Sequence, residues 1–182
     1  LVVERLSRYI VGQLLALKSD AVEAFREFCV RHFLPDIAQT DGDGNYEAQF
    51  AQFCVAMSIT LETSATNTHE QNWLAEIGMK LVFMVARADL LRSGLPIEHW
   101  ADAVMNAIST VNCRYTKGVN VEATPYELRH GYRPDLSMKR AFGQPCNVLV
   151  HEPAGAVSSR VIHGYYVGLA FGYTAWKVYF PG

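Results

Sequence analysis

The sequence lacks any long apolar run and any low-complexity tract. No stretch of roughly eighteen apolar residues occurs along the 182 residues, and no basic segment followed by an apolar region and a small-residue cleavage site is present. These absences disfavour membrane-spanning and secreted classes of protein. We therefore expect a soluble intracellular protein without a membrane partner.

The sequence contains few cysteines, and their spacing indicates neither a metal site nor a set of disulfides. The four cysteines are far apart, and none forms a Cys-x-x-Cys pair or lies at zinc-site spacing from a histidine. We expect buried free thiols rather than a disulfide framework or a zinc site. The residues are Cys29, Cys54, Cys113 and Cys146.

An excess of positive charge is also missing. Lys and Arg number 16 against 18 Asp and Glu, giving a net charge of -2 and a pI near 6.3. Nonspecific affinity for nucleic acid comes mainly from Lys and Arg that displace counterions from phosphates. This balance disfavours a pure nucleic-acid-binding module, and an isolated domain of this kind would hold DNA weakly.

Half of the residues are hydrophobic, enough for one core and a small appendage.

The hydrophobic spacing predicts an alternation of strands and helices in the first part of the chain. A strand-like run covers 9–17, and a helix follows Asp20, which is a suitable N-cap. Pro35 ends that helical pattern. The further predicted elements are a strand at 37–39, a helix at 46–57 and a strand at 59–62.

The second part of the chain is predicted to hold a helical hairpin followed by strands. A long helix over 70–92 stops at Ser93-Gly94, where Gly can adopt a left-handed conformation, and Pro96 begins a second helix that runs to about residue 111. Gly, Pro and Ser turns then separate three predicted strands. These strands cover 146–151, 162–168 and 176–180.

Two acidic residues stand in contexts that suit metal-binding carboxylates. Asp41 follows the short strand 37–39, and Glu76 lies on the long helix. The carboxyl ends of strands in α/β sheets are common ligand sites, so these carboxylates could share a divalent cation. The alternative is that Asp41 is a loop acid and Glu76 a solvated helix residue.

The segments around these acids resemble motifs of the integrases of copia-type retrotransposons. The chain has Thr40-Asp41-Gly-Asp-Gly-Asn-Tyr46 where that family has T-D-N-G-G-E-[FY], and Glu70-Gln-Asn-Trp-Leu-Ala-Glu76 where it has Q-Q-N-G-V-A-E. The likeness covers nearly the whole chain, with the motifs in the order of the family. The later matches are Ser93-Gly-Leu-Pro96, Thr124-Pro-Tyr-Glu127, Gly131-Tyr-Arg-Pro134, Phe142-Gly-Gln-Pro145 and Gly164-Tyr-Tyr-Val-Gly168.

The resemblance implies a fold and a division of the chain. It predicts an α/β, ribonuclease H-like fold of the retroviral integrase type, with a mixed sheet and flanking helices, plus a C-terminal β-rich, small-barrel-like extension. The corresponding segments are an integrase-core-like domain at 1–115, a helical and loop connector at 116–141, and the β-rich extension at 142–182.

The resemblance also implies the residues of the site. Asp41 and Glu76 would be catalytic and would bind Mg²⁺ or Mn²⁺, while Asn72, Lys80 and Arg87 are candidates for contact with DNA. A solvated helix face is the alternative for the two cations. The family needs a further Asp on its first strand, and no residue here matches it. Either that strand precedes Leu1 or it was lost.

Departures from the family pattern favour a protein contact over a DNA contact. The basic and polar arc that follows the catalytic Glu in the family is replaced by Ile77, Gly78 and Met79, and Trp73 replaces a Gly. Large aromatic residues often anchor protein interfaces. Trp73 and Ile77 are therefore predicted to form an interface, with a second copy of the chain or with other nuclear proteins.

Two functions from different classes follow. The first is a catalytically impaired, integrase-like domain derived from a copia-type retrotransposon, which serves as a nuclear protein-interaction and assembly module. The alternative is an active integrase that carries out metal-dependent 3′-end processing and strand transfer, with its first catalytic Asp upstream of Leu1.

Overall fold

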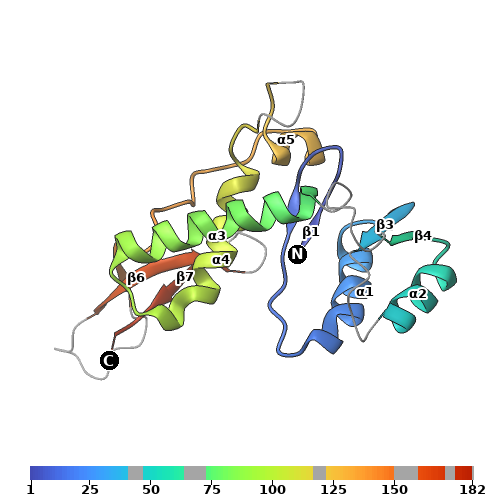
Figure 1. Cartoon of the computed structure of the whole chain (residues 1–182). Coiled ribbons are helices and arrows are strands. Elements are labelled where there is room, and N and C mark those ends of the chain that lie inside the picture. Colours follow the sequence, from blue (N-terminus) through green and yellow to red (C-terminus); the bar gives the residue numbers. More distant parts are fainter. Residues whose placement is uncertain (41–46, 64–72, 117–121, 150–159, 171–174, 182) are drawn as a thin grey trace. The chain divides into compact units, whose positions relative to one another are not determined.

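The computed structural model describes residues 1–40, 47–63, 73–116, 122–149, 160–170 and 175–181. These residues form a mixed α/β protein of helices and small sheets (Figure 1). The chain divides into two compact units, each described here by itself. The first contains Leu1 and Gln13–Ile77, and the second contains Val2–Gly12 and Gly78–Gly182. No helix among the described residues combines the length and apolarity needed to cross a membrane.

The first unit is built on a parallel pair of strands joined by a helix. β3 pairs with β4 in a register that places Ile37 opposite Thr60, and α2 forms the crossover that parallel strands require. The elements are η1 (Lys18–Asp20), α1 (Ala21–Arg31), β3 (Ile37–Thr40), α2 (Glu47–Ala56) and β4 (Thr60–Thr63).

Aromatic side chains of α1 and α2 form the core of the first unit. The Phe25 ring lies 4.9 Å from that of Phe50 and 6.0 Å from that of Phe53, between ring centroids. Cys54 on the same face of α2 is completely buried. This packing explains the helical spacing of the aromatic residues in both helices.

The second unit combines a β-hairpin, three helices and an antiparallel sheet. Val2 pairs with Val11 in the hairpin, and the sheet has the order β5-β6-β7 with β6 in the centre. Its elements are β1 (Val2–Val3), β2 (Ile10–Val11), α3 (Trp73–Ser93, from Gly78 onward), η2 (Ile97–His99), α4 (Trp100–Asn112), α5 (Pro125–His130), β5 (Pro145–Leu149), β6 (Val161–Leu169) and β7 (Trp176–Tyr179).

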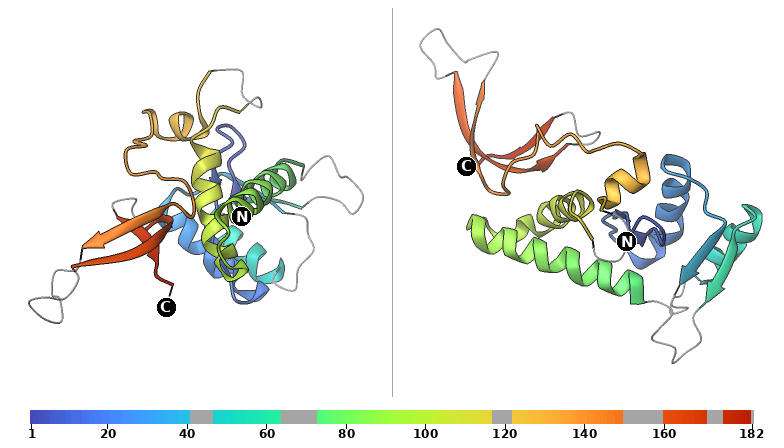
Figure 2. Two further views of the ribbon diagram at one scale, coloured as in Figure 1. Left: turned by 90° about the vertical axis from the view of Figure 1, so that its left-hand side faces the viewer. Right: turned by 90° about the horizontal axis from the view of Figure 1, so that it is seen from above.

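The core of the second unit lies between α3, α4 and the sheet (Figure 2). Small buried residues such as Ala86, Ala103 and Ala107 line the helices there and leave room for the larger side chains. Phe142 and Val167 contribute from the C-terminal part of the chain. The helical hairpin and the antiparallel sheet therefore share one core.

The predicted hairpin turn at Ser93-Gly94 is confirmed. Gly94 has a φ of 68°, a left-handed value that a glycine adopts without a steric penalty. The Ser93 hydroxyl donates to the carbonyl of Leu90 at 2.9 Å and accepts from the backbone N–H of Leu95 at 3.2 Å. The three predicted C-terminal strands are also present as β5, β6 and β7, although the predicted end of the first, at 150–151, lies outside the described residues.

The predicted strand over 9–17 is wrong in length, because within this range only Ile10–Val11 forms a paired strand. A Cβ atom at Gly12 would lie 2.3 Å from Cδ1 of Ile108, so the backbone passes close to α4 at this point. Beyond it Leu14 and Leu15 are exposed. The first residues of the apolar run are therefore packed in the core of the second unit, and the rest of the run does not continue the strand.

The sheet architecture also differs from the prediction. The described strands form three separate sheets rather than one mixed sheet, and β5-β6-β7 is open, without the barrel-like closure expected of the extension. The short β1 and β2, two residues each, offer too few backbone groups to join a larger ladder. The three-part division at 115 and 141 stays a prediction.

The four cysteines are free thiols, as expected. Only Cys54 is fully buried, whereas the other three are partly exposed, so the burial prediction holds for one of them. Burial raises the pKa of all four thiols, which keeps them in the less reactive protonated form.

Candidate functional site

Glu76 lies in the first turn of α3 and is exposed to solvent. A carboxylate near the N-terminal end of a helix is stabilised by the helix dipole, and its oxygens are the hard ligands that Mg²⁺ or Mn²⁺ accepts. β3 covers Ile37–Thr40, one residue longer than the predicted strand at 37–39, and Thr40 directly precedes Asp41. Asp41 and Asn72 both lie outside the described residues, so the separation of the two acids stays a prediction.

Within the described ranges, no three His, Cys, Asp or Glu side chains gather into a group able to hold a metal ion. Asp41 is not among these residues, so the predicted metal site stays a prediction. Glu76 is the one member of the proposed acidic pair whose position is described. It provides an accessible carboxylate in the first turn of α3.

The other predicted site residues share one side of α3. We define the outer face of α3 by exposed residues spaced three or four apart, so that they follow one side of the helix. These residues are Trp73, Ile77, Lys80, Met84, Arg87 and Leu91. Four of the six are apolar, with Trp73 47% and Ile77 50% exposed. The two cations predicted to contact DNA lie among them.

The opposite side of α3 is buried through Gly78, Val82 and Ala86. A helix that is apolar on both its buried and its outer faces is normally covered on both. Met79 and Phe83 enlarge the exposed apolar area beside the outer face, at 45% and 46% exposure. The outer face therefore has the composition of a contact surface rather than of a solvated helix.

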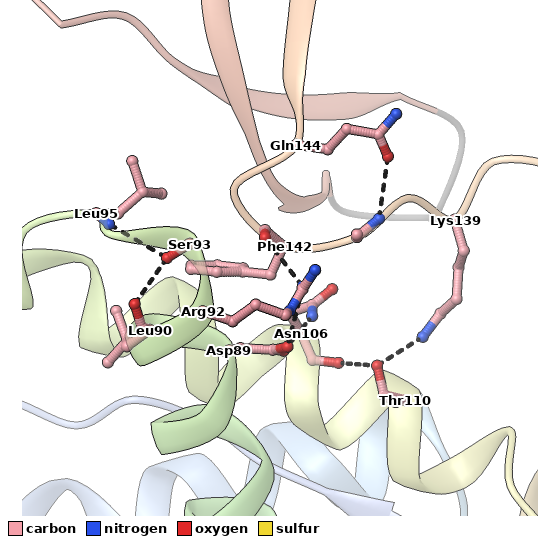
Figure 3. Close-up of polar contacts among 11 residues, drawn as sticks. Asp89, Leu90, Arg92, Ser93, Leu95, Asn106, Thr110, Lys139, Phe142 and Gln144 are labelled. Carbon is pink, nitrogen blue, oxygen red and sulfur yellow. Dashed lines mark hydrogen bonds and ion pairs between the residues drawn. The ribbon is translucent and has the colours of Figure 1, made fainter.

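A polar network fixes α3 against α4 and the chain that follows α5 (Figure 3). Asn106 donates from its side-chain amide to Oδ2 of Asp89 at 2.9 Å. The Arg92 guanidinium contacts Oδ1 of Asp89 at 3.5 Å and donates to the carbonyl of Phe142 at 3.2 Å. Sequence reasoning missed this network, although an Asp on the inner half of an apolar helix is a signal for a buried partner.

A second group missed by sequence reasoning surrounds α5. The rings of Tyr126 and His130 lie 4.4 Å apart, and Tyr9 from the hairpin lies 5.4 Å from His130, between ring centroids. Burial, followed by the charge of Arg129, lowers the pKa of His130, while Glu4 acts in the opposite direction. Glu4 lies in the hairpin turn and contacts Arg129 at 3.4 Å.

The fold of this chain is similar to that of a chain in a solved retroviral assembly. The chain is similar to one in the cryo-EM structure of the simian T-cell lymphotropic virus intasome in complex with PP2A regulatory subunit B56 gamma. The TM-score is 0.61 at 15% sequence identity, over 98% of this chain and 68% of that chain. No protein-family model and no curated protein matches the sequence. The likeness shows that the chain shares its fold with a chain of that assembly.

Proposed function

We propose that this chain is an integrase-like domain of ribonuclease H-like fold, derived from a copia-type retrotransposon, that acts as a nuclear protein-assembly module. The observation that carries the proposal is the apolar outer face of α3, where Trp73 and Ile77 are about half exposed. The ordered motifs and the fold shared with a chain of an intasome support the integrase relationship.

The surface that follows Glu76 supports assembly rather than DNA joining. Ile77 and Met79 are exposed where the related integrases present basic and polar side chains. Apolar side chains gain nothing from phosphates but are stabilised when a protein partner removes them from water, by roughly 25 cal/mol per Å² buried. Lys80 and Arg87 then lie at the edge of a protein contact, where charges set orientation more than affinity.

The partner that this face fits best is a second copy of the chain. Aromatic and aliphatic anchors with charges beside them can pair with an identical helix in antiparallel orientation, so that Glu76 of one copy approaches Arg87 of the other. Such pairing is isologous, as most homodimer contacts are. The intasome to which the chain is similar is itself in complex with a regulatory protein, which is consistent with protein partners for this fold.

The experiment is sedimentation velocity over a range of concentrations. The double variant Trp73→Ala with Ile77→Arg is expected to shift the distribution to the monomer, with an unchanged melting temperature. Ile97→Arg is the matched control, because Ile97 is 69% exposed but lies outside the outer face. Equal association of all three proteins would refute the proposal, and an unfolded double variant would place Trp73 and Ile77 in the core instead.

One observation favours a second function, an active integrase. β3 ends immediately before Asp41, and Glu76 presents an exposed carboxylate in the first turn of α3. In that case the two carboxylates would hold Mg²⁺ or Mn²⁺, which would supply charge stabilisation during phosphoryl transfer. Joining of a matched DNA end that disappears in Glu76→Gln would establish this function, and joining at background level would exclude it for this chain.

A further inference from the structure

A cavity of about 200 Å³ lies within the second unit, between the last turn of α4, α5 and residues 134–139. Tyr9, Tyr126, Met138 and Leu169 give it aromatic and aliphatic walls. The polar side of the cavity includes Lys139. The cavity uses none of the residues of the outer face of α3, so it is independent of the proposed function.

The Lys139 ammonium is only partly satisfied. It donates to Oγ1 of Thr110 at 3.2 Å, and that hydroxyl in turn donates to the carbonyl of Asn106 at 2.9 Å (Figure 3). An ammonium has three N–H donors. Within the described residues Lys139 forms no ion pair, so two donors remain for another acceptor.

The acids near Lys139 form no ion pair with it among the described residues. Asp89 attracts the ammonium through space, but its two oxygens contact Asn106 and Arg92. Asp135 lines the cavity, but its Oδ1 accepts from the backbone N–H of Ser137 at 2.8 Å. Burial lowers the pKa of Lys139, as expected of an amine that loses water without gaining a full counter-ion.

We propose that this cavity binds a small carboxylate ion that carries an apolar group, with Lys139 as its counter-ion. A carboxylate would accept charge-assisted hydrogen bonds from the free donors of the ammonium. The apolar group would lie against the Tyr9 and Tyr126 side chains, which line one wall of the cavity. The volume of about 200 Å³ is below the roughly 300–1,000 Å³ of drug-sized sites, which favours a ligand with a single ring or a short chain.

Cys113 makes the cavity accessible to measurement, because its thiol lines the same space. Benzoate is the probe, and benzamide is its neutral control of nearly identical shape. The rate of Cys113 alkylation by iodoacetamide is followed by peptide mass spectrometry, with Cys29 as an internal reference in the first unit. We expect benzoate to slow alkylation at Cys113 but not at Cys29, and benzamide to protect about tenfold less well at equal concentration.

Variants separate charge from shape. Lys139→Met keeps the length of the side chain but removes the ammonium, and is expected to weaken protection by benzoate about tenfold, the loss of one charged hydrogen-bond partner. Lys80→Met is the control that removes the same charge from the outer face of α3. In this variant benzoate should protect Cys113 as well as it does in the wild type. A capped peptide with one internal glutamate is compared with benzoate in the same assay. Stronger protection of Cys113 by benzoate indicates that the ligand is a small free carboxylate. Stronger protection by the peptide indicates that the ligand is the side-chain carboxylate of a peptide.

Three results would overturn the proposal. The first is an unchanged rate of Cys113 alkylation in saturating benzoate. The second is protection of Cys113 by benzamide that equals the protection by benzoate. The third is protection of Cys113 by benzoate in Lys139→Met that equals the protection in the wild type. If Lys139→Met does not fold, the comparison of benzoate with benzamide on the wild-type chain still decides, because it needs no variant.

Discussion

Asn112 at the end of α4 binds both backbone groups of Ile10, 102 residues earlier in the chain. Its Oδ1 accepts from the N–H of Ile10 at 2.8 Å, and its Nδ2 donates to the carbonyl of Ile10 at 2.8 Å. Asn112 is 3% exposed. A single amide side chain thus joins the β1-β2 hairpin to the helical part of the second unit.

Replacing Asn112 by Ala should be strongly destabilising. Two buried backbone groups of Ile10 would lose their partners, at a cost of about 3 kcal/mol in the free energy of unfolding. Urea denaturation followed by circular dichroism measures this loss. Asn147→Ala, in an exposed residue of β5, is the control and should change stability by less than about 0.5 kcal/mol. Similar stability of both variants would show that water satisfies Ile10.

Gly143→Ala and Gly131→Ala separate steric clash from backbone strain. Both glycines have left-handed φ values, 74° and 77°. A Cβ atom at Gly143 would lie 2.2 Å from Cβ of Ser93, whereas one at Gly131 would meet no atom within 4 Å. We expect Gly131→Ala to cost about 1 kcal/mol and Gly143→Ala about 3 kcal/mol, measured by thermal denaturation. Equal costs would mean that the 93–95 turn yields to the added methyl group.

Thr124 caps α5, and its removal should loosen that helix. Its hydroxyl accepts from the N–H of Glu127 at 3.1 Å, while Glu127 Oε2 accepts from the N–H of Thr124 at 2.8 Å. Thr124→Ala is expected to cost about 1 kcal/mol, and Thr124→Ser much less. Hydrogen exchange at the amide of Glu127 should accelerate in the Ala variant alone. Equal exchange in both variants would argue against the cap.

The same cap gives stability a dependence on pH. Hydrogen bonds from Thr124 and then the charge of Arg133 lower the pKa of Glu127 from its usual value. Because the folded-state pKa is depressed, this stabilisation is present above the pKa of the unfolded chain and is lost as pH falls through the folded pKa. The melting-temperature advantage of the wild type over Glu127→Gln should therefore shrink on acidification. A constant difference across that range would contradict this assignment.

Divalent cations should bind weakly. Glu76 is exposed, and the described residues contain no group of three or more metal-binding side chains, so Mg²⁺ or Mn²⁺ would keep most of its water. Calorimetry with either ion is expected to show little heat for the wild type and the same for Asp41→Asn. Tight binding that Asp41→Asn abolishes would instead establish the integrase metal site.

The sequence alone determined the local elements of this protein. Hydrophobic spacing and turn residues located α1, α3, α4 and the three C-terminal strands. These signals are readable in the sequence because the periodicity of a helix or strand, and the left-handed turn at Gly94, depend on residues that are neighbours in the chain. The cap of α5 could also have been recognised, since Thr124 and Glu127 have the spacing of a capping box. The resemblance to integrases led to the α/β fold that the structural comparison supports.

Only the tertiary structure decided which distant residues meet. No periodic pattern marks Asn112 as the partner of Ile10, or Lys139 and Cys113 as neighbours in one cavity. The close approach of Gly12 to Ile108, directly after the end of β2, is likewise not visible in the apolar sequence of this segment. These contacts join residues that are far apart in the chain, 102 positions for Ile10 and Asn112. Their energies depend on packing and burial, and local residue preferences do not encode them.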